Sequence, residues 1–428
     1  MYLVMDTAYG INKIKKYNLL IIAYANDYPT EDRPIAGPFV KEFIEQVGKN
    51  YNCKIMLVER RFVGIGVTSQ LRRFGRIVRR LLGSKSVKDI LVSNSPEDDE
   101  ESIIRVTYPV FILRNFPLHF LNGITSVRMA RKALIKSRFK PDIMQTFKSF
   151  PPAYIAWKLK RKFHAPVVNM EYQGPFSSYE AEPHCMGRAI AAIKNIDRTV
   201  HTKYQIEVIK AYGIPSEKLG LLYFGINTDE FIFNEEEHLE RKVEAEQKRF
   251  KLLIVGRIEE EKGFKYLINA INMLVTEYPN IQLSIVGPKG NCFEWVMNSI
   301  KILNLQRNVK YLGIVKQRRD VSALINKHHI LIIASLIESQ GMTMLEALSC
   351  GKPVVATRCG GPQEIINKDN GILVAPCDSN ALAYGIREIM GHYAKYHPWK
   401  IREFAVKTFG YGVVCEKIHK LYEELIDR

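Results

Sequence analysis

The sequence predicts an α/β protein made of two doubly wound domains, each with a parallel sheet. Short apolar runs recur along the chain of 428 residues, and segments with apolar residues at helical spacing lie between them. Apolar runs without polar alternation are typical of strands that are buried on both faces of a parallel sheet. Their alternation with helices indicates a doubly wound fold, and the length suits two domains of about 200 residues each.

The second half of the chain shows this pattern most clearly. We predict strands there at 251–256, 281–287, 309–313, 330–335, 353–358 and 371–375. Between the first two, the apolar residues from Phe264 to Val275 recur at a spacing that places them on one face of a helix.

The first half follows the same pattern. We predict strands at 18–24, 53–59, 103–108, 142–147, 166–171, 198–202 and 219–225, and a helix that carries Phe39, Phe43 and Val47. The polar stretch 234–248 contains nine charged residues and has little to bury, so we expect it to join the two domains.

Composition excludes several classes of protein. The seven cysteines are scattered and form no C-x-x-C pair, which argues against a disulfide framework or a zinc ribbon. No apolar run is long enough to span a bilayer, and residues 1–16 lack the apolar core of a signal peptide. We therefore expect a cytoplasmic protein that is soluble or peripheral. The net charge of +17 suits nucleic acid, an anionic membrane or a phosphorylated small molecule as partner.

The stretch 338–346 carries the strongest chemical signal. It follows a predicted buried strand, Gly341 permits a tight turn, and a helix should begin near Met342 and end at Gly351. Backbone N–H groups at the start of such a helix lie at the carboxyl end of a parallel strand, where doubly wound sheets bind phosphate.

Two carboxylates flank this predicted anion site. Glu338 lies in the turn, and Glu346 lies one turn into the helix. Carboxylates beside a phosphate repel it unless they accept hydrogen bonds from hydroxyl groups, which ribose and sugars supply. The alternative for Glu346 is an ordinary first-turn acid that the helix dipole favours; its pairing with Glu338 favours the binding role.

Two cations belong to the same edge of the second sheet. Gly256 and Arg257 end a predicted strand, and Lys262 precedes the next helix. Arginine binds a diphosphate through planar paired hydrogen bonds and lysine binds it as a point charge. The alternative is that both side chains neutralise the three glutamates between them, at 259–261.

Together these motifs resemble the retaining family 4 glycosyltransferases of GT-B fold, the glycosyl transferases group 1. The resemblance rests on Glu338 and Glu346 with the residues that follow as far as 357, on the segments 360–364 and 370–374, and on Gly256-Arg257 with Lys262-Gly263. It implies two Rossmann-like domains that face each other across a cleft. The acceptor domain would span 1–230 and the donor domain 231–409, and the helix at 410–428 would return to the first domain.

The resemblance implies transfer of a sugar from a nucleoside diphosphate donor with retention of configuration. The catalytic residues would be Arg257, Lys262 and Glu338. The implied donor-binding residues are Gly37, Gly256, Arg257, Lys262, Glu338, Gln340, Gly341, Met342, Thr343 and Glu346. Among them, Arg257 and Lys262 would hold the diphosphate, Glu346 the ribose, and Glu338 the sugar. No D-x-D-type dipeptide stands at a strand end, so we expect no metal and no cofactor.

The first domain departs from the family pattern. Many members carry a histidine after the strand predicted at 166–171, where this chain has Tyr172 and Gln173. Gln173 can bind a sugar hydroxyl, but it cannot act as an acid or base. We expect ordinary packing or surface roles for His184 and His201. We favour front-face attack over a nucleophilic role for Glu338.

Two other classes of function stay open. One is a nucleotide-sugar epimerase or a phosphorylase on the same fold. The other is a membrane-associated sugar-nucleotide binding protein without transfer activity. The donor sugar, the base, the acceptor and the oligomeric state are not determined by these motifs.

Nine of the positive charges lie in residues 60–88, which contain no acid. Apolar residues from Leu71 to Leu82 alternate with arginines at helical spacing. Such a helix can lie in a membrane interface on the cytoplasmic face, where a glycan or lipid-linked acceptor would be in reach. The expected membrane patch is Arg72, Arg73, Arg76, Arg79 and Arg80. The alternative is that the apolar stripe packs on the first domain; no nucleic-acid-binding motif accompanies the charge.

Overall fold

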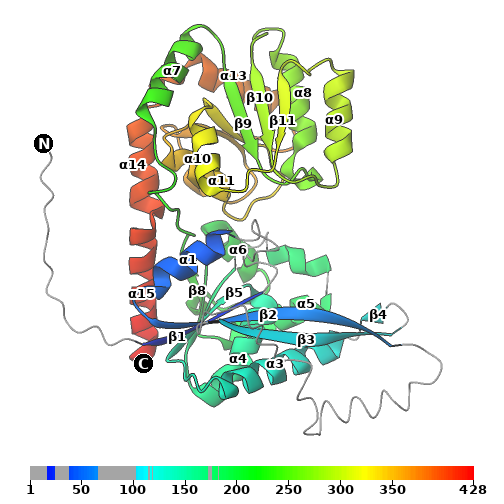
Figure 1. Ribbon diagram of the computed structural model, residues 1–428, viewed down its shortest axis with the longest axis vertical. Coiled ribbons are helices and arrows are strands. Elements are labelled where there is room, and N and C mark those ends of the chain that lie inside the picture. Colours follow the sequence, from blue (N-terminus) through cyan, green and yellow to red (C-terminus); the bar gives the residue numbers. More distant parts are fainter. Residues whose placement is uncertain are drawn as a thin grey trace, which may run out of the picture.

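The computed structural model describes residues 17–24, 38–65, 103–113, 116–117, 119–171, 176–181 and 183–428. Within these residues the chain forms two α/β domains, one above the other in Figure 1, and each contains a sheet of mainly parallel strands with helices on its faces. The prediction of two doubly wound domains is confirmed.

In the described part of the first domain, eight strands form one sheet in the order β4-β3-β2-β1-β5-β6-β7-β8. Neighbours are parallel except β3 and β4. The strands are β1 (Asn18–Tyr24), β2 (Asn52–Ile65), β3 (Ile103–Leu113), β4 (Phe116–Pro117), β5 (Ile143–Phe147), β6 (Val167–Met170), β7 (Arg198–His201) and β8 (Leu219–Leu221). The helices are α1 (Pro38–Gly48), α3 (His119–Lys136), α4 (Tyr154–Phe163), α5 (Pro183–Asn195) and α6 (Lys203–Lys210).

The central strand β1 shows why its sequence is apolar throughout. Leu19 and Ile21 pack in one cluster with α1, whereas Leu20 and Ile22 pack in another with α3 and α4. Successive side chains of a strand point to opposite faces of the sheet. Both faces of β1 are therefore covered, as the absence of polar alternation predicts.

Two strands of the first sheet are longer than predicted. β2 continues through Arg60 to Ile65, and β3 continues to Leu113; the two pair in parallel register along this extension. The predicted strand ended at 59, and charged residues follow it in the sequence. Backbone hydrogen bonds between the strands do not depend on side-chain polarity, so the ladder continues.

The described part of the second domain has six parallel strands in the order β11-β10-β9-β12-β13-β14. They are β9 (Lys251–Val255), β10 (Gln282–Val286), β11 (Val309–Gly313), β12 (Ile330–Ile333), β13 (Val354–Thr357) and β14 (Gly371–Val374). The helices are α7 (Glu235–Glu246), α8 (Phe264–Leu274), α9 (Phe293–Ile302), α10 (Arg318–Asn326), α11 (Met342–Ser349), α12 (Pro362–Ile365), α13 (Ser379–Gly391) and α14 (Pro398–Phe409). All six strands predicted for this half are confirmed.

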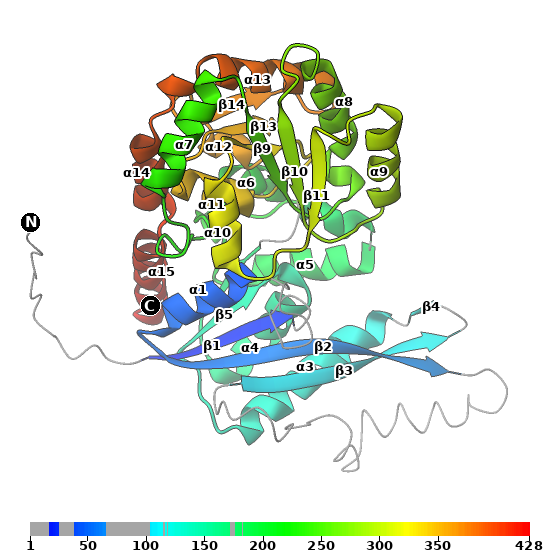
Figure 2. The same ribbon diagram turned by 45° about the horizontal axis from the view of Figure 1, so that its top comes forward.

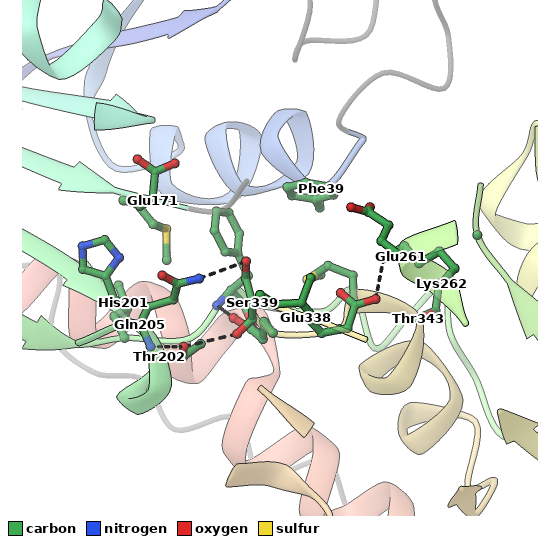
Figure 3. A pocket seen from close by; sticks show the side chains of 18 of the residues that line it. Phe39, Glu171, His201, Thr202, Gln205, Glu261, Lys262, Glu338, Ser339 and Thr343 are labelled. Atoms are coloured by element: carbon green, nitrogen blue, oxygen red, sulfur yellow. Dashed lines mark hydrogen bonds and ion pairs between the residues drawn. The ribbon is translucent and has the colours of Figure 1, made fainter. Parts of the chain in front are cut away.

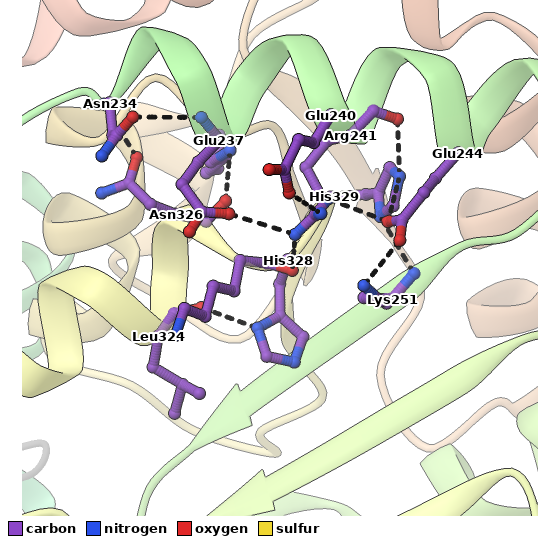
Figure 4. Close-up of polar contacts among 12 residues, drawn as sticks. Asn234, Glu237, Glu240, Arg241, Glu244, Lys251, Leu324, Asn326, His328 and His329 are labelled. Carbon is purple, nitrogen blue, oxygen red and sulfur yellow. Dashed lines mark hydrogen bonds and ion pairs between the residues drawn. The ribbon is translucent and has the colours of Figure 1, made fainter.

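The polar stretch expected to join the domains instead forms α7 and is fixed to the second domain. Arg241, with its side chain 5% exposed, donates to the carbonyl oxygen of Lys327 at 2.8 Å. Its guanidinium also lies 2.8 Å from carboxylate oxygens of Glu240 and Glu244 (Figure 4). The prediction was wrong because it counted only apolar burial. One buried arginine with several acceptors can also fix a helix.

The chain crosses between the domains at two adjacent segments. After β8, which ends four residues earlier than predicted, Ile226 forms a parallel bridge with Gly410, and its N–H donates to the carbonyl of Phe409 at 2.8 Å. The helix α15 (Tyr411–Ile426) follows and packs on the first sheet beside α1 (Figures 1 and 2). There the hydroxyl of the buried Tyr422 donates to Gln145 at 2.7 Å.

Candidate functional site

A cavity of about 420 Å³ lies where the carboxyl ends of the two sheets face each other. In the second domain it adjoins β9 and β12, and these are the neighbours at which the strand order of the sheet reverses. Ligands of doubly wound sheets bind at such a switch point. Its lining residues are Phe39, Met170, Glu171, Val200, His201, Thr202, Gln205, Leu222, Phe224, Val255, Gly256, Arg257, Glu261, Lys262, Ile337, Glu338, Ser339, Gln340, Gly341, Met342 and Thr343 (Figure 3).

The turn before α11 has the predicted conformation. Gly341 has φ 83°, in the left-handed region that favours glycine, and α11 begins at Met342. The first N–H groups of a helix have no partner within it. Since Met342 and Thr343 line the cavity, the positive end of α11 lies at its wall.

Lys262 and Glu338 form the central ion pair of the cavity. The Nζ atom of Lys262 lies 2.5 Å from Oε1 of Glu338, and the hydroxyl of Ser335 donates to the same oxygen at 2.9 Å. Both charged side chains are mostly buried, with 23% and 17% exposed. The structure therefore brings together the carboxylate and the lysine that the sequence placed 76 residues apart.

Gly263 explains how Lys262 reaches this position. Its φ is 68°, and a Cβ atom there would lie 1.9 Å from the carbonyl oxygen of Ala334, at the end of β12. Any larger residue would push the loop away from the strand. The glycine thus allows the loop after β9 to pack against the segment that carries Glu338.

Arg257 lies at the mouth of the cavity. Its side chain is 62% exposed, and it pairs with Glu259 at 3.1 Å and more distantly with Glu261 at 3.9 Å. Pairing with neighbouring glutamates was the alternative prediction for this residue. Exposed ion pairs of this kind are weak, so Arg257 can exchange them for a bound anion.

Contacts between the domains form one wall of the cavity. The hydroxyl of Thr202 donates to the carbonyl of Ser339 at 3.2 Å, and the amide of Gln205 lies 3.2 Å from the Ser339 hydroxyl. The side chain of Gln340 accepts from the N–H of Phe224 at 2.8 Å and donates to its carbonyl at 3.0 Å. The side chain of Gln340 is therefore bonded to the backbone of Phe224, which leaves the Gln340 backbone for the anion site that the sequence predicts.

Glu364 adds a further contact between the domains. Its carboxylate accepts from the N–H groups of Lys203 and Tyr204, at 2.9 and 2.5 Å, at the start of α6. A carboxylate is favourable at the positive end of a helix. This contact holds α6, and with it Thr202 and Gln205, beside the second domain.

Glu346 lies next to the cavity but does not line it. It is 5% exposed, and its Oε1 accepts from Nη1 of Arg318 at 3.0 Å. Burial raises the pKa of the Glu346 carboxyl, and the guanidinium opposes that rise. The sequence analysis expected Glu346 to reach the crevice; the structure places it outside the lining and pairs it with an arginine that was not predicted.

Several predicted site residues lie outside the described residues. They are Gly37, Gln173 and the arginines of the expected membrane patch, Arg72, Arg73, Arg76, Arg79 and Arg80.

The first domain contributes cavity residues to which the sequence analysis gave no binding or catalytic role: Glu171 was not singled out, and His201 was expected to have an ordinary packing or surface role. Glu171 directly follows β6, is 5% exposed, and accepts from the N–H of Ser149 at 2.7 Å; burial raises the pKa of its carboxyl. His201 ends β7, and burial lowers its pKa to about 3, so it is neutral near pH 7. The available signal was position, because Glu171 follows β6 and His201 ends β7, and these two strands are parallel neighbours.

The described residues were also compared with the requirements of a metal site and of a membrane-spanning helix. Within them, no group of three or more His, Cys, Asp or Glu side chains is arranged to hold a metal ion. No helix in the described ranges has the length and apolar character needed to cross a bilayer.

The fold and the cavity define a class of protein: two Rossmann-like domains that enclose a ligand cleft, the GT-B architecture. Solved structures have the same fold. The Anabaena protein Alr3699/HepE in complex with UDP matches with a TM-score of 0.70 and 15% identity, over 95% of this chain and 100% of that one. Sucrose-phosphate synthase from Thermosynechococcus elongatus matches with a TM-score of 0.71 and 18% identity, over 96% and 100%.

Sequence comparison gives the family. A family model described as glycosyl transferases group 1 matches residues 235–403. The uncharacterized glycosyltransferase MJ1178 of Methanocaldococcus jannaschii is 30% identical over 356 residues, which cover 80% of this chain and 92% of that protein. The chain belongs to the glycosyl transferases group 1 family.

Other relatives match over a smaller part of their length. The D-inositol 3-phosphate glycosyltransferase of Corynebacterium jeikeium is 29% identical over 59% of this chain and 61% of its own. The uncharacterized glycosyltransferase MJ1607 of M. jannaschii is 30% identical over 49% of this chain and 53% of its own. The match thus spans between half and two thirds of these two proteins.

Proposed function

We propose that the protein transfers a sugar from a nucleoside diphosphate sugar to an acceptor, with retention of configuration and without a metal. The observation that carries the proposal is the Lys262–Glu338 pair beside the N-terminus of α11, in a cavity between two domains. Cations and helix N–H groups suit a diphosphate, and the adjacent carboxylate suits sugar hydroxyls. The Anabaena protein HepE, which has the same fold, has been solved in complex with UDP, with UDP-glucose, and with UDP and glucose.

In this proposal the donor replaces contacts that the cavity residues make with one another. The diphosphate lies between Arg257, Lys262 and the first N–H groups of α11. Glu338 then exchanges part of its contact with Lys262 for hydroxyl groups of the sugar, and Glu346 accepts from the ribose. Each exchange replaces one charged hydrogen bond by another, so it adds little desolvation cost.

The reaction step follows from where charge develops. The bond between the anomeric carbon and the phosphate oxygen breaks, the acceptor oxygen bonds to that carbon on the same face, and the leaving phosphate oxygen takes the acceptor's proton. Negative charge grows on the diphosphate, and preorganised cations and N–H groups stabilise it more in the transition state than in the ground state. Because these cations and N–H groups stabilise the developing charge, the proposed reaction does not require a metal ion.

We assign the acceptor to the first domain, where the ends of β6 and β7 form the opposite wall of the cavity. We further propose a glycan or lipid-linked acceptor, with the protein peripheral on the cytoplasmic face of a membrane. The basic run within residues 60–88 supports this part of the proposal.

The test begins with a thermal-shift screen of UDP-, GDP- and ADP-sugars, followed by an assay of nucleotide release in EDTA. A transferase gives release of the nucleoside diphosphate with the preferred donor, and release increases with an acceptor. An epimerase would interconvert the sugar and leave the diphosphate attached, and a binding protein would shift the melting temperature without release. No response to any donor would count against the proposal.

A further inference from the structure

Arg318 stands at the centre of a charged cluster that joins the two domains. It is the first residue of α10, where a cation is unfavourable because the helix dipole is positive there. Figure 2 shows α1 of the first domain below α10 and α11 of the second. The position of Arg318 is therefore explained by its partners and not by its own helix.

Three carboxylates surround this one guanidinium. Nη1 lies 3.0 Å from Oε1 of Glu346 on α11, and Nε lies 3.2 Å from Oε2 of Glu230 in the crossing segment. Nε also contacts Oε1 of Glu42, which lies on α1 of the first domain. The guanidinium carbon lies 4.7 Å from the centre of the Phe231 ring, which restrains the plane of the group.

The cluster is buried and its charges do not balance. The side chains of Glu42, Arg318 and Glu346 are 14%, 16% and 7% exposed. With all three carboxylates ionised the cluster would carry a net charge of −2. In the part of the chain that the structure describes, the buried Nη2 atom of Arg318 has no hydrogen-bond partner. Nη2 can therefore donate to a further acceptor without breaking the contacts of Nε and Nη1.

Glu346 depends on this arginine for its charge and its direction. A buried carboxyl tends to keep its proton, and the ionised form is the one that accepts hydrogen bonds from two hydroxyl groups. Arg318 lies within hydrogen-bond distance of Glu346. The same guanidinium contacts Glu42 of the first domain through Nε, so the two carboxylates share one cation.

We propose that Arg318 is a positioning residue that orients Glu346 for the ribose of the donor, and that Glu42 of the first domain competes for the same guanidinium. The inference rests on the proposed function, in which Glu346 binds the ribose. It adds a link between the approach of the two domains and the affinity for the donor. Arg318 acts through Glu346 and touches no reacting atom.

The test measures what the ribose hydroxyls contribute to binding. Dissociation constants are measured by calorimetry at pH 8 for the tightest binder among UDP, GDP and ADP and for its 2′,3′-dideoxy form. The ratio of the two constants, dideoxy over ribose, is called the ribose ratio. For the wild type we expect a ratio of about 10 to 100, typical of hydrogen bonds to a charged group.

Variants of the second domain test the positioning role. Arg318→Gln should lower the ribose ratio about fivefold or more. Arg318→Lys keeps the positive charge but loses the planar set of guanidinium N–H donors, so it should lower the ribose ratio less than Arg318→Gln does. Combining Arg318→Gln with Glu346→Gln should lower the ratio no further than Glu346→Gln alone, because both act on one contact. If Arg318→Gln does not fold, Arg318→Lys still tests the role.

Variants of α1 test the competition. Glu42→Gln should raise the ribose ratio about twofold to threefold. Glu45→Gln is the matched control, since Glu45 lies on the same helix, 55% exposed and paired with Lys41; it should leave the ratio unchanged. Equal ribose ratios in Glu42→Gln and Glu45→Gln would overturn the proposal that Glu42 competes for Arg318.

The remaining outcomes separate the two proposals. A ribose ratio that collapses in Glu346→Gln but is unchanged in both Arg318 variants would overturn the positioning role and leave the proposed function intact. A ratio that is unaffected by Glu346→Gln, or absence of binding to all three nucleotides, would overturn the ribose contact and this inference with it.

Discussion

Glu42 should make the stability of the protein depend on pH near neutrality. Burial raises the pKa of its carboxyl from 4.5 to about 7; the charges of Glu230 and Glu346 add to the rise, while Arg318 and the Tyr411 hydroxyl oppose it. Because the folded state holds this proton more tightly than the unfolded state, the stabilising contribution is complete below pH 4.5 and is lost as pH rises through about 7. A shift of this size corresponds to about 3 kcal/mol, as an upper value.

The comparison of wild type with Glu42→Gln isolates this effect. Glutamine has the shape of the protonated acid, so the two proteins should have similar stability at pH 5. At pH 8 the variant should be the more stable by about 2–3 kcal/mol, measured as the difference in unfolding free energy from urea denaturation. Glu45→Gln should follow the wild type at both pH values. A stability difference between wild type and Glu42→Gln that is the same at pH 5 and pH 8 would refute the reasoning.

Three further predictions concern the cavity, the loop beside it and the basic run. Arg257→Ala should lower turnover about 100-fold or more, because it removes a preorganised cation from the leaving diphosphate. Arg387→Ala is the control, since Arg387 forms an exposed pair with Glu277. Equal turnover in the two variants would contradict a role of Arg257 in stabilising the diphosphate. Gly263→Ala should lower the melting temperature by about 5 °C or more because its Cβ would meet the Ala334 carbonyl, whereas Gly412→Ala, with no atom within 4 Å of its added Cβ, should not. Flotation with vesicles of anionic lipid should show that the protein binds them. Binding should be lost when the five arginines of the expected membrane patch are changed to glutamine, and binding that persists would exclude the proposed membrane helix. The five are Arg72, Arg73, Arg76, Arg79 and Arg80.

The strands of the second domain could be predicted because their sequence signal is local. Each is a short apolar run that ends near glycine or a polar residue, and all were found within about two residues of their bounds. The start of α11 was also predictable, since a glycine after a buried strand and before helical spacing has few structural interpretations. The position of Lys262 and Glu338 at one edge was predictable too, because parallel strands place their carboxyl ends there, but the ion pair between them was not predicted.

The errors arose where side chains meet across long sequence distances. Helix α7 was taken for a joint because its attachment depends on the buried Arg241 and on the carbonyl of Lys327, 86 residues away. The Glu346–Arg318 pair spans 28 residues and Glu42 comes from the other domain. No periodicity in a sequence reports such contacts, because they depend on how helices pack and not on the spacing within one helix.

The sequence by itself determined the doubly wound class, the strand and helix pattern of the second domain, and the residues that gather at the end of its sheet. These depend on burial patterns and backbone preferences that act over a few residues. The tertiary structure alone decided which first-domain residues face that edge, that Glu346 is held by Arg318, and that Glu42 contacts the same arginine. The physical reason is that a buried charge needs a partner wherever the fold supplies one, and here the partner lies in another helix or in the other domain.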